Sequence, residues 1–101
     1  MEKYQHITEM ENIQNEHQQK LNELNSLLDF FEKHEEEYKK LIDYYYSEQR
    51  AQDLEDDEKH LIPEDLKRGV LSEDGTYNFM MDHYDTGVRM MEIALKIIKD
   101  R

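Results

Sequence analysis

The 101-residue sequence predicts an all-α protein: a long N-terminal helix, short connector helices and a long C-terminal helix. We expect them to pack as an elongated helical bundle with coiled-coil-like seams. Apolar residues recur at alternating steps of three and four along both ends of the chain, which is the spacing of one helix face. Residues 2–46 contain no glycine or proline that would stop a helix. Only 37% of the residues are hydrophobic and 38% are charged, which suits a thin helical assembly better than a thick core.

The N-terminal helix is predicted over residues 1–46. Nine of the twelve positions in its heptad phase are apolar or aromatic, and the phase comprises Ile7, Met10, Gln14, His17, Leu21, Leu24, Leu28, Phe31, Glu35, Tyr38, Ile42 and Tyr45. The simplest interpretation is one continuous helix. The alternative is a break near Asn22, Asn25 and Ser26, because these residues are weak helix formers.

The connector is predicted over residues 47–71. Ser47 can cap a short helix that runs to about Lys59, and the acidic run at residues 53–58 within it is interpreted as a solvated face. Pro63 suits the first turn of a second short helix, and Gly69 suits its left-handed terminator.

The C-terminal helix is predicted over residues 72–101, where Ser72 can accept a hydrogen bond from an amide of the first turn. Its apolar stripe holds for three heptads and comprises Tyr77, Met81, Tyr84, Val88, Met91, Leu95 and Ile98. Gly87 weakens this helix without ending it. We expect residues 1–101 to form a single helical domain that self-associates, since the first helix is longer than the second can cover.

The segment PEDLKRGVLSED, residues 63–74, resembles the signature block of a family of small bacterial proteins known only as a domain of unknown function. The resemblance extends to Tyr45, Tyr46, Ser47, Asp53 and Tyr77. At Arg50 and Gly75 the chain departs from the pattern, in which tryptophan and alanine are expected. The resemblance implies an all-helical protein and implies no activity.

Within this block, Lys67, Arg68, Gly69 and Ser72 form the candidate site. A cap serine, a nearby glycine and two cations can hold an anion or a partner at a helix start. The structural interpretation is that each residue serves turn chemistry, with the basic pair bridging to the acidic first helix.

The net charge of −12 disfavours direct binding to nucleic acid or to anionic membranes, and leaves a basic protein partner open. The absence of cysteine excludes a disulfide framework and a thiolate zinc site. No apolar run is long enough to cross a bilayer, so we expect a cytoplasmic protein. No pattern of nucleophile, base or phosphate loop is found, so we predict no enzyme and no cofactor.

Histidine–acid pairs at three-residue spacing, Asp57 with His60 and His34 with Glu37, are the weighed metal ligands. No Glu-x-x-His motif of di-iron bundles occurs, and we predict no metal site. His17, beside Gln14 in the seam, is interpreted either as a register-fixing, pH-sensitive polar layer or as an exposed helix end. The tyrosines and the methionine pairs are interpreted as packing residues.

The leading functional hypothesis is a non-enzymatic protein-interaction module that forms homo-oligomers and offers an acidic surface to a protein partner. One alternative is an acidic mimic of nucleic acid that inhibits a basic DNA- or RNA-binding protein. The other alternative is a helical bundle that binds a metal or a small ligand.

Overall fold

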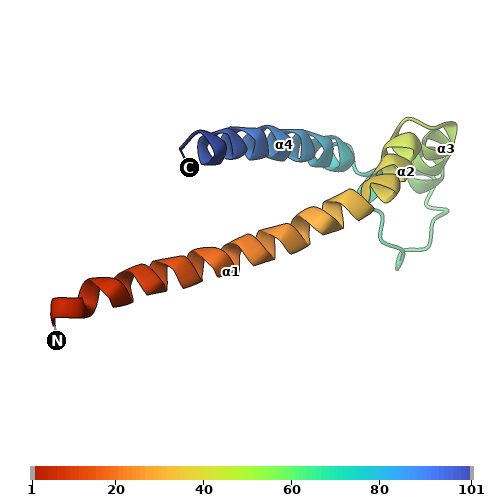
Figure 1. Cartoon of the computed structure of the whole chain (residues 1–101). Coiled ribbons are helices and arrows are strands. Elements are labelled where there is room, and N and C mark those ends of the chain that lie inside the picture. The colour runs from red at the N-terminus through yellow and green to blue at the C-terminus, as the bar shows by residue number, and fades with distance from the viewer. Residues whose placement is uncertain (1, 101) are drawn as a thin grey trace. The chain divides into compact units, whose positions relative to one another are not determined.

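The computed structural model is entirely helical in its regular elements, as the sequence predicted (Figure 1). It describes residues 2–100, and no strand occurs among them. The long N-terminal and C-terminal helices are confirmed, and shorter helices lie between them. In chain order the elements are η1 (Glu2–Tyr4), α1 (Gln5–Lys33), α2 (Glu35–Tyr45), α3 (Glu48–Glu58), η2 (Gly69–Leu71) and α4 (Gly75–Asp100).

The predicted continuous helix over residues 1–46 is wrong at His34, where α1 ends and α2 begins. His34 has φ −90° and ψ 0°, and its ring stacks on Phe30 with the centroids 4.7 Å apart. Three glutamates follow as the first turn of α2, and acidic residues are stabilised at a helix N-terminus. The sequence therefore favours a new helix start here. The alternative break near Asn22, Asn25 and Ser26 is also wrong, because α1 runs without interruption through these residues, where the Asn25 side chain donates to the Leu21 carbonyl.

The expected start and end of α3 are confirmed. Ser47 has an extended conformation and its hydroxyl accepts the Arg50 amide at 3.1 Å. At the other end His60 takes the left-handed conformation, with φ 60°. The Leu61 amide bonds the Asp56 carbonyl and the His60 amide bonds the Asp57 carbonyl, which is the Schellman pattern of helix termination. A histidine thus occupies the position that usually holds glycine.

The predicted short helix after Pro63 is wrong, as is the left-handed Gly69. Residues 63–66 form one turn, closed by the Leu66 amide on the Pro63 carbonyl at 3.1 Å, and this turn does not continue as a helix. One turn fixes several dihedral angles for a single hydrogen bond, so it does not propagate without help. Gly69 instead begins η2, and no described glycine has a positive φ.

The C-terminal helix begins at Gly75, three residues after the predicted start. Its first main-chain bond runs from the Asn78 amide to the Asp74 carbonyl. Ser72 lies before the helix with an extended backbone, φ −67° and ψ 154°. Gly87 does not end α4, as predicted, and the helix continues to Asp100. No helix formed by residues 2–100 combines the length and the hydropathy that crossing a bilayer requires.

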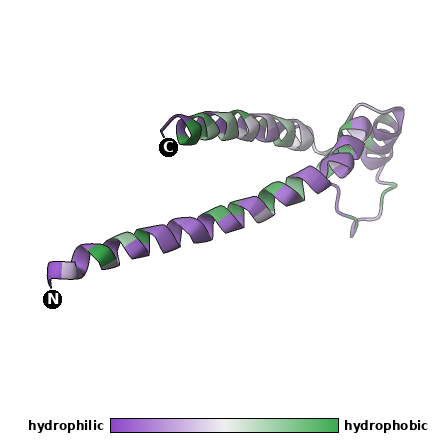
Figure 2. Cartoon of the chain, in the orientation of Figure 1, coloured by the Kyte–Doolittle hydropathy of each residue, from purple (hydrophilic) through white to green (hydrophobic). Residues whose placement is uncertain are grey.

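The chain divides into two units, Met1–Leu41 and Ile42–Arg101, with the boundary inside α2. The expectation of a single domain over residues 1–101 stays a prediction. Among residues 2–100 no apolar side chain is fully buried, and Thr76 is the one buried residue, at 4% exposure. Along α1 and α4 hydrophobic and hydrophilic residues alternate from turn to turn, as Figure 2 shows. Neither helix is therefore buried within a core of its own unit.

Candidate functional site

The side-chain interactions of the second unit gather around α3, and we call this cluster the polar junction. At its first corner the Tyr44 hydroxyl donates to Asp53 Oδ2 at 2.5 Å, and the Gln49 amide donates to Asp53 Oδ1 at 2.8 Å. Both carboxylate oxygens of Asp53 are thereby occupied. The junction ties the end of α2 to the middle of α3, and its members are Tyr44, Ser47, Arg50, Asp53, Asp57, Arg68 and Ser72.

Two serines make the same local arrangement at the two helix starts of the junction. The Ser47 hydroxyl donates to the Tyr44 carbonyl at 2.6 Å and accepts the Arg50 amide at 3.1 Å. The Ser72 hydroxyl donates to the Gly69 carbonyl at 2.8 Å and accepts the Gly75 amide at 3.1 Å. Each hydroxyl bridges a carbonyl three residues before it and an amide three residues after it. The predicted role of Ser72 in holding a first-turn amide is confirmed.

Gly75 is required by the second serine bridge. A Cβ atom at this position would lie 2.3 Å from Ser72 Oγ and 3.0 Å from the Gly69 carbonyl oxygen. The first distance is far below any ordinary contact, so the serine hydroxyl would have to move. The departure from alanine that the sequence shows at Gly75 thus matches the close approach of the Ser72 side chain.

Arg50 joins the two serine bridges. Its guanidinium lies 4.6 Å from the centroid of the Tyr45 ring, Nε donates to the Val70 carbonyl at 3.2 Å, and a terminal nitrogen donates to the Ser72 carbonyl at 3.4 Å. One side chain therefore holds α3 against the segment that leads into α4. Arg50 is the second departure from the family pattern, and its hydrogen bond to Ser72 joins residues 22 apart in the sequence.

The second arginine of the junction, Arg68, forms a salt bridge to Asp57 of α3, with both side chains about one-third exposed. The expectation that the basic pair bridges to the N-terminal helix is therefore wrong for Arg68. The acidic run at residues 53–58 is likewise not wholly a solvated face, because Asp53 and Asp57 each have partners. Arg68 pairs with Asp57 of this run, and the composition of the run alone does not predict this salt bridge.

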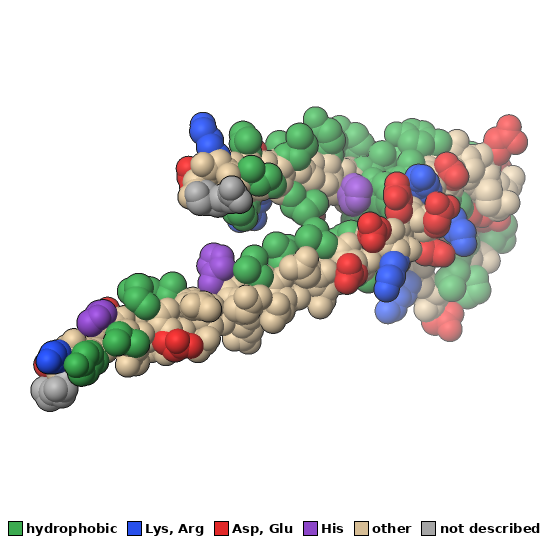
Figure 3. All heavy atoms as spheres, in the orientation of Figure 1, with side chains coloured by type: hydrophobic (Ala, Val, Ile, Leu, Met, Phe, Trp, Pro, Cys, Tyr) green, Lys and Arg blue, Asp and Glu red, His purple; other side chains and the backbone are tan. Residues whose placement is uncertain are grey.

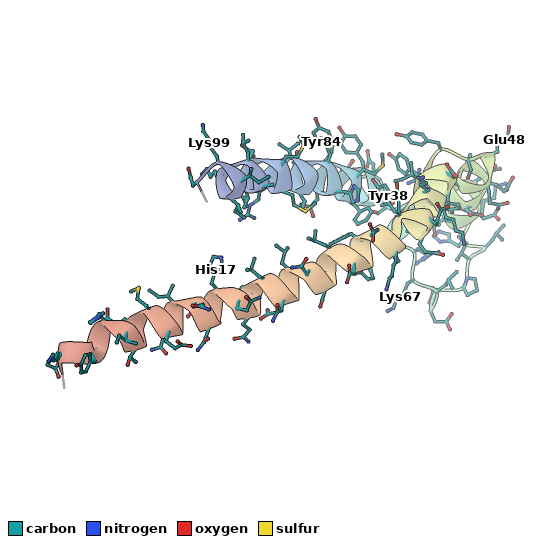
Figure 4. All side chains as sticks on the ribbon, in the orientation of Figure 1. His17, Tyr38, Glu48, Lys67, Tyr84 and Lys99 are labelled. Atoms are coloured by element: carbon teal, nitrogen blue, oxygen red, sulfur yellow. The ribbon has the colours of Figure 1, made fainter. Side chains whose placement is uncertain are left out.

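The four predicted site residues do not converge on one point. Gly69 and Ser72 are joined by a hydrogen bond, and Arg68 is engaged with Asp57. Lys67 is exposed and extends outward from its loop (Figure 4). The Ser72 hydroxyl already donates once and accepts once. Cap geometry accounts for Gly69 and Ser72 and a salt bridge accounts for Arg68, while the anion hypothesis stays a prediction.

The surroundings of the Tyr44–Asp53 pair favour a neutral tyrosine and an ionised aspartate. Burial, followed by the hydrogen bond to Asp53 and its negative charge, raises the pKa of Tyr44 to about 12. The hydrogen bonds from Tyr44 and Gln49 lower the pKa of Asp53 below its usual value. The neutral Tyr44 phenol donates to the Asp53 carboxylate and so holds the end of α2 to α3. Both oxygens of this carboxylate already accept hydrogen bonds, so the pair serves a structural role.

Sequence reasoning missed Tyr44, Arg50 and Asp57 as members of the junction. Their partners lie 9, 11, 20 or 22 residues away, so no helical spacing marks them. For Arg50 the one signal in the sequence was its departure from the expected tryptophan.

The histidine–acid pairs fall in different surroundings. Asp57 is bonded to Arg68, and His60 ends α3. His34 stacks on Phe30. His17 is exposed on α1 (Figure 4), with the neighbouring Gln14 also exposed. Residues 2–100 contain no group of three or more histidine or acidic side chains arranged to hold a metal ion.

Comparison with known proteins agrees with the resemblance found in the sequence. No curated protein and no solved structure matches the chain. The model of a family described as a domain of unknown function, DUF4298, matches residues 7–93. This range contains α2, α3, η2, all of the polar junction and most of α1 and α4. The chain therefore belongs to the DUF4298 family.

Proposed function

We propose that the chain is a non-enzymatic protein-interaction module that forms homo-oligomers and presents an acidic surface to a protein partner. In this proposal the polar junction fixes the helix connections, and the long helices provide the contacts. We also propose that the protein acts in the cytoplasm of a bacterium. The composition supports the cytoplasm, and the resemblance of residues 63–74 supports the bacterial origin.

The observation that carries the proposal is the exposed apolar surface of both long helices. In α1, Leu24 is 44% and Phe31 is 52% exposed; in α4, Val88 is 40% and Leu95 is 64% exposed. Hydrophobic side chains are visible along both helices in the space-filling view (Figure 3). These residues stand at heptad spacing, which is the pattern of helices that pack against other helices. Apolar surface arranged in this way favours association, since burial stabilises it by about 25 cal/mol per Å².

The acidic surface supports the second half of the proposal. The net charge is −12, and Figure 3 shows acidic side chains where α2 and α3 lie. Such a field attracts a basic partner over distances of about a Debye length and repels nucleic acid. Since the apolar stripes and the acidic surface belong to different side chains, self-association and partner binding can be tested separately.

Self-association is tested by light-scattering mass over a range of protein concentrations. We expect a mass above that of one 12.4 kDa chain. Leu24→Asp places a charge in the stripe of α1 and should lower the mass. Asn22→Asp introduces the same side chain on the other side of α1, where its oxygen still accepts from Gln18, and should leave the mass unchanged. A monomer at every concentration would contradict the proposed self-association.

Partner binding is tested by capture from native lysate at low and high salt, with mass spectrometry of the bound proteins. We expect a protein that elutes as the salt concentration rises, because screening weakens contacts between exposed charges. Recovery of a DNA- or RNA-binding protein under these conditions would select the nucleic-acid mimic. Recovery of the chain alone at both salt concentrations would remove the acidic-surface half of the proposal.

A further inference from the structure

The apolar stripe of α1 lies exposed along the whole helix. Every residue from Glu2 to Glu37 is exposed, and within the stripe Ile7 is 56%, Leu24 is 44% and Leu28 is 40% exposed. Besides α1, the first unit holds η1 and the start of α2 among its described residues. Long helices of folded proteins owe most of their stability to the packing of an apolar face. The stripe of α1 therefore needs a second helix from outside its own unit.

Two polar residues interrupt this stripe. Its eight positions within α1 alternate between the a and d positions of a heptad, and Gln14 and His17 hold two neighbouring ones. The six apolar positions are Ile7, Met10, Leu21, Leu24, Leu28 and Phe31. Polar groups lose free energy when they are buried against apolar side chains. The helix that covers the stripe should therefore offer polar side chains opposite these two positions.

A second copy of α1, parallel and in register, meets this requirement at every layer. It sets Gln14 against Gln14 and His17 against His17 of the other copy, and it sets each of the six apolar residues against itself. The predicted stripe of α4 consists of tyrosine, methionine, valine, leucine and isoleucine, so it offers no amide or imidazole. Polar residues that match each other in a seam fix the register of the pair.

The antiparallel arrangements of two α1 helices fit less well. The one that overlaps all eight layers sets Gln14 against Leu24 of the other copy, and it sets His17 against Leu21. The one that aligns Gln14 with His17 overlaps only six layers and leaves the last two apolar layers of the stripe outside the contact. The parallel arrangement keeps all eight layers and places polar side chains opposite polar side chains.

The charges beside the seam agree with the parallel pairing. In a parallel pair each g position of one helix faces the e position of the next heptad in the other helix. Four such pairs form along α1, and none of them places like charges together. They are His6–Glu11, Ile13–Gln18, Lys20–Asn25 and Leu27–Glu32. The antiparallel pair with eight layers would instead bring Lys20 beside Lys20 of the other copy.

The remaining charges of α1 do not face the partner in this arrangement. They occupy positions b, c and f, which point away from the seam. These residues are Glu9, Glu16, Glu23, Asp29 and Lys33. The seam itself is therefore free of charge repulsion over the length of α1.

We propose that two copies of the chain pair through the stripe of α1, parallel and in register, with Gln14 and His17 as matched polar layers. Since α1 has 29 residues, the contact is about 43 Å long. This inference deepens the proposed self-association and rests on it, because it names the surface, the direction and the register of the contact.

The chain contains no cysteine, so one introduced cysteine reports on one position without background. Ile7→Cys and Leu24→Cys place a thiol in the seam on either side of the two polar layers. Each variant is measured by light scattering in its reduced form and then oxidised alone, and we expect each to form a disulfide-linked dimer. Ser26→Cys, at position f on the opposite side of α1, is the matched control and should form no such dimer.

The outcomes separate the geometry of the contact from self-association itself. Residues 7 and 24 lie about 26 Å apart along the helix, so a parallel pair cannot join them by a disulfide. A dimer that forms only when Ile7→Cys and Leu24→Cys are mixed would show antiparallel pairing and overturn the proposal. A dimeric mass with no seam disulfide, or with equal disulfide formation by Ser26→Cys, would overturn the α1 contact and leave self-association standing. A wild-type chain that is monomeric at every concentration would overturn both.

The polar layers give a second measurement, which needs no cysteine. The double variant Gln14→Leu, His17→Leu replaces two polar layers with apolar ones and should lower the dissociation constant by about tenfold or more. When this variant is mixed with the wild type, native mass spectrometry should show fewer mixed dimers than random pairing gives, because each mixed dimer sets Gln14 and His17 against leucine. An unchanged dissociation constant, or random pairing in the mixture, would overturn the matched layers.

Discussion

The contacts of Arg50 in the polar junction allow the stability of a variant at this position to be predicted. Arg50→Met keeps an unbranched side chain of similar helix propensity and removes the guanidinium. The loss comprises two hydrogen bonds, at 3.2 Å to the Val70 carbonyl and 3.4 Å to the Ser72 carbonyl, and the contact with the Tyr45 ring at 4.6 Å. Val70 and Ser72 are both exposed residues, so we expect water to replace the arginine at their carbonyls with little desolvation penalty.

The expected loss follows from these three contacts. A hydrogen bond contributes about 0.5–1.5 kcal/mol net, and an exposed cation–π contact about 0.5–1 kcal/mol. The longer bond and the partial exposure place both hydrogen bonds near the lower end of that range. We therefore expect Arg50→Met to lower the free energy of unfolding by about 2 kcal/mol. Arg50→Lys keeps the charge over Tyr45 without the fork of donors, and should fall between Arg50→Met and the wild type.

Urea unfolding at fixed protein concentration measures the loss, and hydrogen exchange locates it. The amide of Gly75, which is bonded to Ser72, should exchange faster in Arg50→Met, because the segment is no longer held against α3. A loss below about 0.5 kcal/mol, which is the range of ordinary surface substitutions, would refute the reasoning. So would a full loss of stability with unchanged exchange at Gly75.

Three further predictions concern single positions of the same unit. His60→Gly should stabilise the fold by up to about 1 kcal/mol in urea unfolding, since glycine has no Cβ strain at φ 60°, and His60→Ala should give no gain. In an alkaline absorbance titration, the tyrosine signal near pH 12 should disappear in Tyr44→Phe and move to lower pH in Asp53→Asn. Because the folded pKa of Tyr44 is raised, its contribution to stability is complete below about pH 10 and is lost as the pH rises toward about 12; a stable fold over that range would contradict the assignment. Gly87→Ala, where a Cβ meets nothing within 4 Å, should raise the thermal midpoint through a gain of about 1 kcal/mol in helix propensity, whereas Gly75→Ala should show no such gain because it displaces Ser72 Oγ.

The elements that depend on local chemistry were predictable from the sequence. The heptad stripes predict the two long helices, Ser47 predicts the start of α3, and the hydroxyl role of Ser72 follows from its place before a helix. These signals succeed because the interacting groups lie within one or two turns of each other. The effect of Gly87 was also predictable. The low helix propensity of glycine is too small a penalty to end a helix whose apolar stripe continues before and after it.

The elements that depend on distant partners were not predictable. Residues 63–69 have the start and stop signals of a helix, yet Arg68 bonds Asp57 and no α-helix forms over these residues. The left-handed residue proved to be His60, where the Schellman bonds of α3 fix the backbone, and not Gly69. Of the polar junction, the sequence predicted roles for Ser47 and Ser72 and singled out Arg68, but the pairing of Tyr44 with Asp53 has no sequence signature.

The short sequence separation of the junction contacts has a kinetic consequence. The Arg50–Ser72 bond joins residues 22 apart, and the Tyr44–Asp53 bond joins residues 9 apart. Closing such short loops has a small entropic cost, and domains rich in local contacts fold in microseconds to milliseconds. The proposed self-association is bimolecular and would slow on dilution. Refolding should therefore show a fast phase independent of protein concentration, in which the junction forms, followed by a phase whose rate rises with concentration, so that each chain has its turns in place before it meets its partner.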